Sequence, residues 1–76
     1  MTLSDSILEA MPVGARMTST ELVDTIYPDC RRSERWQKQN QIVKQLNRMR
    51  KFHIMEVVGT APGKANNKLN LWERMA

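Results

Sequence analysis

The sequence predicts a small α+β domain in which three helices are followed by a C-terminal two-stranded β-ribbon. Two short stretches with helical periodicity precede a longer basic one, and two β-rich runs then flank a loop that contains Gly and Asn. A length of 76 residues allows a single domain, over residues 1–76, near the lower limit at which one apolar core folds unaided.

The opening segment predicts a helix over residues 3–11. Thr2 or Ser4 can accept backbone N–H bonds at its start, and Asp5 is favourable near the positive end of the helix dipole. Pro12 ends the helix, because proline cannot continue one. We expect its apolar stripe to face the core: Leu3, Ile7, Leu8 and Met11.

A second helix is predicted over residues 19–27, after a very short extended piece at residues 15–17. Thr18 and Glu21 have the spacing of a capping box, in which each side chain accepts a hydrogen bond from the other residue's backbone N–H. Pro28 ends the helix, because the residue before a proline is driven out of helical φ/ψ. The residues expected to point inward are Leu22, Val23, Ile26 and Tyr27.

The longest predicted helix covers residues 34–51. Trp36 falls at the edge of its apolar face, whereas Arg35 and Lys38 fall on that face itself. Either the first turn projects beyond the core, or the helix begins nearer Gln37. The apolar face consists of Ile42, Val43, Leu46 and Met49.

Charge is distributed unevenly along the chain. Residues 31–53 carry a net charge of +7, whereas residues 1–30 carry −4 and residues 54–76 carry +1. Such asymmetry is typical of an element that binds a polyanion, although a solvated basic helix without a partner has the same composition. An isoelectric point near 9.7 favours an acidic partner, with nucleic acid ahead of a membrane surface or an acidic protein.

The face of the third helix opposite its apolar residues is rich in amides and cations and contains no acid. Asn and Gln can pair bidentately with adenine, and Lys or Arg can reach guanine or phosphate, so this composition suits a helix in a DNA major groove. Gln-rich helix faces also occur where nothing binds. The face consists of Gln37, Asn40, Gln41, Lys44 and Arg48, with Gln45, Asn47 and Lys51 at its edges.

Two β-strands are predicted within residues 54–73. Residues 54–58 form a β-rich run that Gly59 is expected to end, and residues 68–73 alternate apolar and polar side chains. The loop between them is longer than a tight hairpin needs and carries lysines.

This order of elements resembles the winged helix-turn-helix DNA-binding family. The matching segments are MTSTELVDTI for the second helix, QIVKQLNRMRKFHIMEVV for the recognition helix and first wing strand, and NKLNLWE for the returning strand. The resemblance covers nearly all of the chain, from residue 3 to residue 74, and rests on pattern rather than on an invariant motif. It implies a small winged helix, three helices plus a C-terminal two-stranded β-wing at residues 54–73, whose third helix enters the major groove.

The resemblance also implies which residues meet DNA. Phe52 stands where related domains often turn on glycine, and packing against the core is its alternative role. The turn from Pro28 to Ser33 is longer than the three or four residues usual in helix-turn-helix connections. Base contacts are implied for Gln37, Asn40, Gln41 and Lys44, base or phosphate contact for Arg48, phosphate contacts for Lys64 and Lys68, and further DNA contacts for Arg31, Arg32 and Arg35.

Three binding hypotheses follow. The first is double-stranded DNA binding by a small transcriptional regulator or architectural protein. The alternative is a protein–protein interaction module within a multi-subunit complex, in which the same surface meets an acidic partner. RNA or single-stranded nucleic acid is the third, because it needs exposed aromatic platforms and Trp36 is the aromatic residue that a core this small can spare. A protein partner or a homodimer, through the first helix or Trp72, remains open.

No catalytic residue, metal site or cofactor is predicted. His53 is the only histidine, and its place at a helix-to-strand junction indicates packing or capping. The lone Cys30 allows no internal disulfide and has no neighbouring ligand for a metal. Because no apolar run is long enough to span a membrane and no secretory signal is present, we expect an intracellular protein, in the cytoplasm, nucleoid or nucleus, without a membrane partner.

Overall fold

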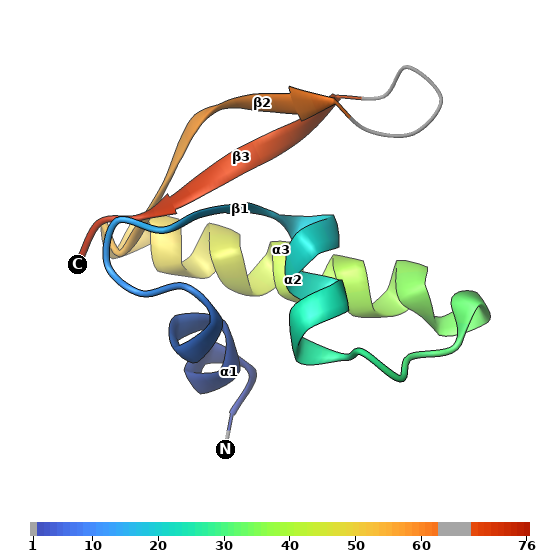
Figure 1. Ribbon diagram of the computed structural model, residues 1–76. Coiled ribbons are helices and arrows are strands. Elements are labelled where there is room, and N and C mark those ends of the chain that lie inside the picture. Colours follow the sequence, from blue (N-terminus) through green and yellow to red (C-terminus); the bar gives the residue numbers. More distant parts are fainter. Residues whose placement is uncertain (1, 63–67) are drawn as a thin grey trace.

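The computed structural model describes residues 2–62 and 68–76 of the chain. Within these residues three α-helices precede a β-hairpin, which confirms the predicted α+β class. Figure 1 shows the elements in chain order from blue to red. Their bounds are α1 Leu3–Ala10, β1 Arg16–Thr18, α2 Ser19–Ile26, the 3-10 turn η1 Arg32–Glu34, α3 Arg35–Lys51, β2 Met55–Pro62 and β3 Lys68–Arg74.

The strands form one antiparallel sheet in which β3 lies between β1 and β2. β1 pairs with the later part of β3, where Arg16 lies opposite Glu73. The Nε atom of Arg16 donates to Oε1 of Glu73 at 2.8 Å, so an ion pair accompanies this strand pairing. The predicted C-terminal ribbon is present as β2 and β3, and the short extended piece before α2 joins it as a third strand, which the sequence did not predict.

β2 is longer than the sequence predicts. Gly59 was expected to end the strand, yet β2 continues to Pro62, which pairs with Lys68. The register shifts between Val57 and Gly59, so the glycine lies at a β-bulge. A glycine inside a strand pattern often marks a bulge, because it supplies no side chain for packing. The bulge lets the hairpin extend beyond the part that covers the core.

Both short helices begin at side-chain caps predicted from the sequence. In α1 the hydroxyl of Thr2, not that of Ser4, accepts from the backbone N–H of Asp5 at 3.2 Å. In α2 the hydroxyl of Thr18 accepts from the Glu21 N–H at 3.2 Å, and the Glu21 carboxylate accepts in return from the Thr18 N–H at 3.4 Å. Each helix ends one residue earlier than predicted.

The cations Arg35 and Lys38 in the first turn of α3 point toward α2 and the residue that follows it. The helix begins at Arg35, after η1, and its first turn packs beside α2. Nη1 of Arg35 donates to Oδ1 of Asp24 in α2 at 2.5 Å. Nζ of Lys38 lies 4.9 Å from the centroid of the Tyr27 ring, within the range of a cation–π interaction. These two cations therefore lie on the inward side of the helix without entering the apolar core.

The end of α3 is a Schellman motif. The backbone N–H of Ile54 donates to the carbonyl of Met49 at 3.0 Å, and the N–H of His53 donates to the carbonyl of Arg50 at 3.1 Å. This motif needs a residue in the left-handed region, and His53 takes it with φ of 60°. Phe52 is therefore not the turning residue, and at 69% exposure it does not pack in the core either.

The apolar core lies between the helices and the sheet, and Trp72 of β3 closes it with 2% exposure. Nη1 of Arg74 donates to the carbonyls of Leu8 and Met11 at 3.0 and 3.1 Å, which satisfies the end of α1 and ties it to β3. The predicted inward residues of the three helices lie in this core or against it, except Val43, which is half-buried on the side of α3 toward β3. The buried members of the core are Ile7, Met11, Leu22, Val23, Ile42, Leu46, Met49, Met55 and Trp72.

α3 crosses the molecule from the side where the hairpin extends to the side where the chain ends. In Figure 1 its start lies on the same side as the far end of β2 and β3, and its last turn lies near the C-terminus. α1 and α2 both contact α3 and hold it against the core. This arrangement leaves the remaining side of α3 open along its length.

Candidate nucleic-acid interface

The open side of α3 carries the amide-and-cation face predicted from the sequence. Ile42, Leu46 and Met49 are buried, so the residues on the opposite side of the helix point outward. Gln37, Gln41, Lys44 and Arg48 are exposed and Asn40 is half-buried. We call these five residues the outer face of α3.

The dimensions of the outer face suit a DNA groove. Gln37 and Arg48 are separated by three turns of helix, or roughly 16 Å at about 1.5 Å per residue. That length corresponds to roughly five base pairs at about 3.4 Å each. A helix with its side chains is about 10–12 Å across, close to the roughly 12 Å width of the major groove.

The electrostatics of α3 are one-sided. No Asp or Glu occurs between Arg35 and Lys51, whereas the acids of the first thirty residues lie on α1, on α2 and in the turn that follows α2. Lys44 and Arg48 are exposed and take part in no ion pair within residues 2–62 and 68–76. A polyanion that approached the outer face would therefore meet cations and amide groups without a neutralising carboxylate from the same helix.

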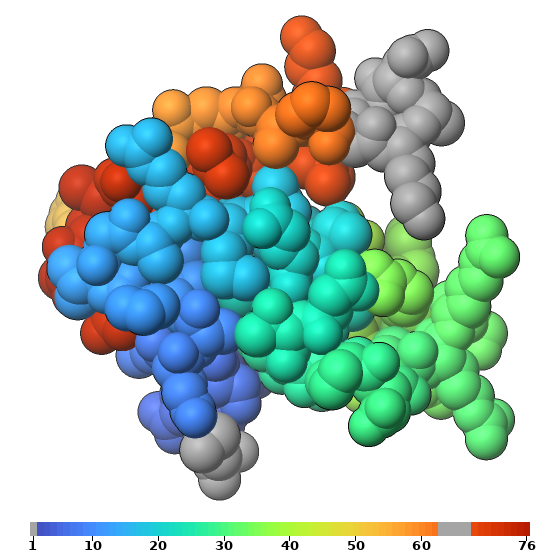
Figure 2. Space-filling view, in the orientation of Figure 1, coloured from blue at the N-terminus to red at the C-terminus, as the bar shows by residue number. Residues whose placement is uncertain are grey.

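The three arginines before the outer face fall into two groups. Arg31 and Arg32 are exposed in and before η1, and Figure 2 shows this green part of the chain projecting at the edge of the molecule. Arg35 instead donates to Asp24, and this hydrogen bond raises the pKa of the Arg35 guanidinium. Arg35 is thus engaged within the protein, while Arg31 and Arg32 present their charges to solvent.

The β-hairpin contributes one described cation to the same side of the molecule. Lys68 is exposed at the start of β3, while Lys64 lies outside the described residues. A groove of about 220 Å³ runs between α3 and β3, and its wall includes Val43 and Asn47 from the helix and Asn70 from the strand. We call it the α3–β3 groove. It joins the hairpin to the edge of the outer face, so the two form one continuous surface.

Trp36 is the aromatic residue that the sequence indicated the core could spare, and it lies at the surface. The side chain is 73% exposed, the highest value among the large apolar residues that the structure describes. It lies one turn before Asn40 on the same side of α3. This position beside the outer face goes beyond its predicted place at the edge of the apolar face.

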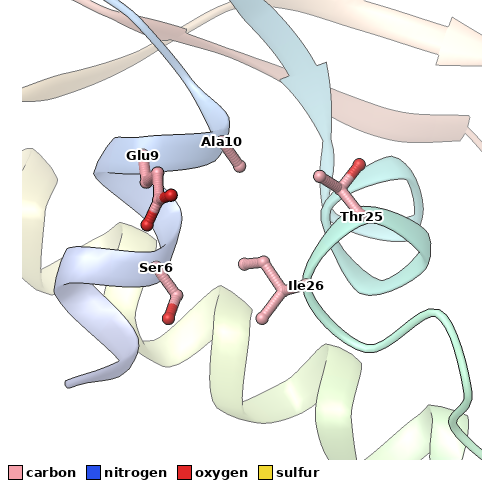
Figure 3. A pocket seen from close by; sticks show the side chains of 5 residues that line it. All are labelled: Ser6, Glu9, Ala10, Thr25 and Ile26. Atoms are coloured by element: carbon pink, nitrogen blue, oxygen red, sulfur yellow. The ribbon is translucent and has the colours of Figure 1, made fainter. Parts of the chain in front are cut away.

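Other hollows of the described surface offer little chemistry. One of about 370 Å³ between α1 and α2 is lined by Ser6, Glu9, Ala10, Thr25 and Ile26, whose side chains Figure 3 shows, and Glu9 is the titratable residue of this lining. Another, of about 480 Å³, lies between α1 and the end of α3, and its lining mixes apolar side chains with Thr2, Ser4, Gln45 and Arg48. We call it the end groove; the apolar residues of its lining are Leu3, Leu8, Met49, Phe52 and Ile54.

Several predictions about other residues can be compared with the structure. The Cys30 thiol is half-buried and donates to the carbonyl of Arg31. No cluster of three or more His, Cys, Asp and Glu side chains in residues 2–62 and 68–76 is placed to bind a metal. The helices of the same residues lack the length and hydrophobicity that a membrane crossing requires. Trp72 is 2% exposed, so its side chain belongs to the core.

Comparisons with known proteins give no assignment: no family model, no curated protein and no solved structure matches this chain.

Proposed function

We propose that this protein is a double-stranded DNA-binding domain of the winged helix type. The outer face of α3 enters the major groove, and the β2–β3 hairpin acts as the wing along the backbone. The observation that carries the proposal is the outer face itself, which is exposed, free of acids and built from the side chains that read base edges and neutralise phosphates. A small transcriptional regulator or an architectural protein is the biological role that fits such a domain.

Each residue of the surface then has a distinct task. Gln37, Asn40 and Gln41 contact base edges, because amides present paired donors and acceptors at fixed spacing. Lys44 and Arg48 neutralise phosphates or reach guanine. The exposed cations before and after the helix, Arg31, Arg32 and Lys68, hold the flanking backbone.

A salt titration of binding to a mixed-sequence duplex tests this function. Five phosphate contacts, from Lys44, Arg48, Arg31, Arg32 and Lys68, give a slope of log affinity against log salt of about −4.5. Lys44→Ala is expected to make that slope shallower by about 1. A slope near zero for the wild-type protein would contradict DNA binding through this surface.

Arg50→Ala is the matched control. Arg50 is an exposed cation of the same helix, but it lies on a different side from the outer face. The variant loses the same charge as Lys44→Ala, so both variants should share any effect of net charge alone. Equal slopes for the two variants would place the phosphate contacts elsewhere on the domain.

The alternative of a protein-interaction module predicts a different result. Amide chemical shifts recorded with a random duplex at low salt should move on α3 and the start of β3 if DNA is the ligand. Unchanged shifts at high duplex concentration would favour an acidic protein as the partner of the outer face.

A further inference from the structure

Trp36 is not part of the apolar core of the domain. The inward side chains next to it are engaged with α2, because Arg35 donates to Asp24 and Nε2 of Gln39 donates to the Ser19 hydroxyl at 3.2 Å. The indole stays in water at 73% exposure, although a Trp side chain can bury roughly 150–250 Å² in a core or interface. Its removal should therefore leave the stability of the domain nearly unchanged.

The surroundings of Trp36 are polar and basic. Arg32 is exposed in η1 just before it, and Gln37 and Asn40 of the outer face lie on the adjoining turn. The side of α3 that carries Trp36 and Asn40 continues, at spacings of three and four residues, to Val43 and Asn47. Those last two residues line the α3–β3 groove, so the indole lies on the helix side that leads into it.

These neighbours favour a nucleobase over a protein as the ligand of the indole. An aromatic anchor of a protein interface usually lies in a well-packed apolar setting. Phe52 is closer to such a setting, because four other apolar side chains line the end groove with it, although Arg48 and three uncharged polar residues line the groove too. The residues of the helix surface next to Trp36 are amides, with an exposed cation in η1 before them, and this is the combination that single-stranded nucleic-acid sites use: charge for the backbone and an aromatic face for the base.

We propose that Trp36 is a base-stacking site, so that the domain prefers DNA in which an unpaired base adjoins the duplex contacted by α3. The proposal rests on the DNA-binding function proposed above and adds the structural class of the target. A stacked duplex hides the faces of its bases, and only an unpaired or unstacked base can present one to the indole. The duplex held by Lys44 and Arg48 fixes where that base lies.

The test compares two DNA ligands by fluorescence anisotropy at one salt concentration: a blunt duplex, and the same duplex with a short single-stranded overhang at either end. The wild-type protein should bind the overhang duplex about 5- to 150-fold more tightly, the range that stacking of one base on an aromatic side chain provides. Trp36→Ala should remove this preference while binding the blunt duplex as the wild-type protein does. Trp36→Phe should keep most of it, because the ring remains.

Phe52→Ala is the matched control, since it removes an equally exposed aromatic side chain from the other end of α3. This variant should keep the full preference for the overhang. Circular dichroism of each variant, compared with the wild type, verifies that the fold is intact. Binding of the overhang should also quench the fluorescence of Trp36, and in Trp36→Phe the buried Trp72 should give no such change.

Three results would overturn the proposal: equal affinity of the wild-type protein for both ligands, a preference that survives Trp36→Ala, or an equal loss in Phe52→Ala. The failure of the underlying function looks different. In that case the wild-type protein would bind neither ligand, whereas failure of the stacking site alone leaves binding to the blunt duplex intact.

Discussion

The two ends of α3 each carry an exposed aromatic side chain, but they differ in every neighbour. Trp36 is close in the chain to Arg32, Gln37 and Asn40, at the start of α3. Figure 1 shows that the β-hairpin extends toward this end of the helix. Phe52 lies beside Leu8 and the other apolar residues of the end groove, next to the C-terminus of the chain. Both ends of the helix carry cations, but only the end at Phe52 also borders a groove with several apolar side chains.

This difference shows that the exposure of an aromatic side chain does not by itself indicate what the side chain binds. The start of α3 is attached to α2 by polar contacts, through Arg35 and Gln39, whereas its end is fixed by core residues and by the backbone bonds of a Schellman motif. Packing and recognition are thus divided around the helix, while its two ends are fixed by different kinds of contact. The division can be tested at both ends and in the middle.

The largest expected effect distinguishes the inward from the outward side of α3. Leu46 is fully buried, so Leu46→Ala removes core contacts and should lower the free energy of unfolding by about 2–5 kcal/mol. Lys44→Ala, two residues away on the outer face, should change it by less than about 0.5 kcal/mol. Urea unfolding followed by circular dichroism measures both. A loss of similar size in the two variants would contradict the orientation of the helix.

A smaller change in the free energy of unfolding is expected for substitutions at the end of α3. His53 adopts φ of 60°, which costs an L-residue roughly 1 kcal/mol and costs glycine nothing. His53→Gly should therefore raise the free energy of unfolding by up to about 1 kcal/mol. Lys51→Gly, at the last residue of the helix, should instead lower it, because glycine is a poor helix former. Thermal unfolding of the two variants gives the signs, and destabilisation by His53→Gly would exclude a left-handed turn at this residue.

The smallest effect on stability is expected at the start of α3. The Asp24–Arg35 pair is solvent-accessible, so water screens it and Asp24→Ala should change the stability of the domain little. The same change releases Arg35 toward DNA, and affinity for a duplex should rise. Asp29→Ala removes an equal charge from an exposed residue that forms no ion pair within the described part of the chain. If both variants raise the affinity equally, net charge explains the gain and Arg35 does not.

Local features of the fold could be predicted from short stretches of sequence. The capping residues Thr18 and Glu21 and the stop at Pro28 fix α2 almost to the residue, because each acts through hydrogen bonds or sterics within one turn. The spacing of Ile42, Leu46 and Met49 likewise identifies the buried side of α3, and with it the outer face.

Other features depended on partners far away in the chain. The third strand exists because β1 meets the end of β3, and Gly59 lies within a strand because β3 extends far enough to pair beyond the bulge. The role of Arg35 required the position of Asp24 on a neighbouring helix. Neither the length of the hairpin nor the engagement of that cation follows from periodicity, which describes one element at a time.

The sequence by itself determined the class of the domain, the identity of its helices and the chemical character of the outer face. It could do so because helical periodicity, capping and charge depend on residues within a few positions of one another. The tertiary structure decided which exposed residues share a surface: it assigned Trp36 to the amide-and-cation end and Phe52 to the end groove. That assignment depends on how α1 and the sheet pack against α3. Such packing joins segments that are far apart in the sequence, so no single stretch of the chain predicts it.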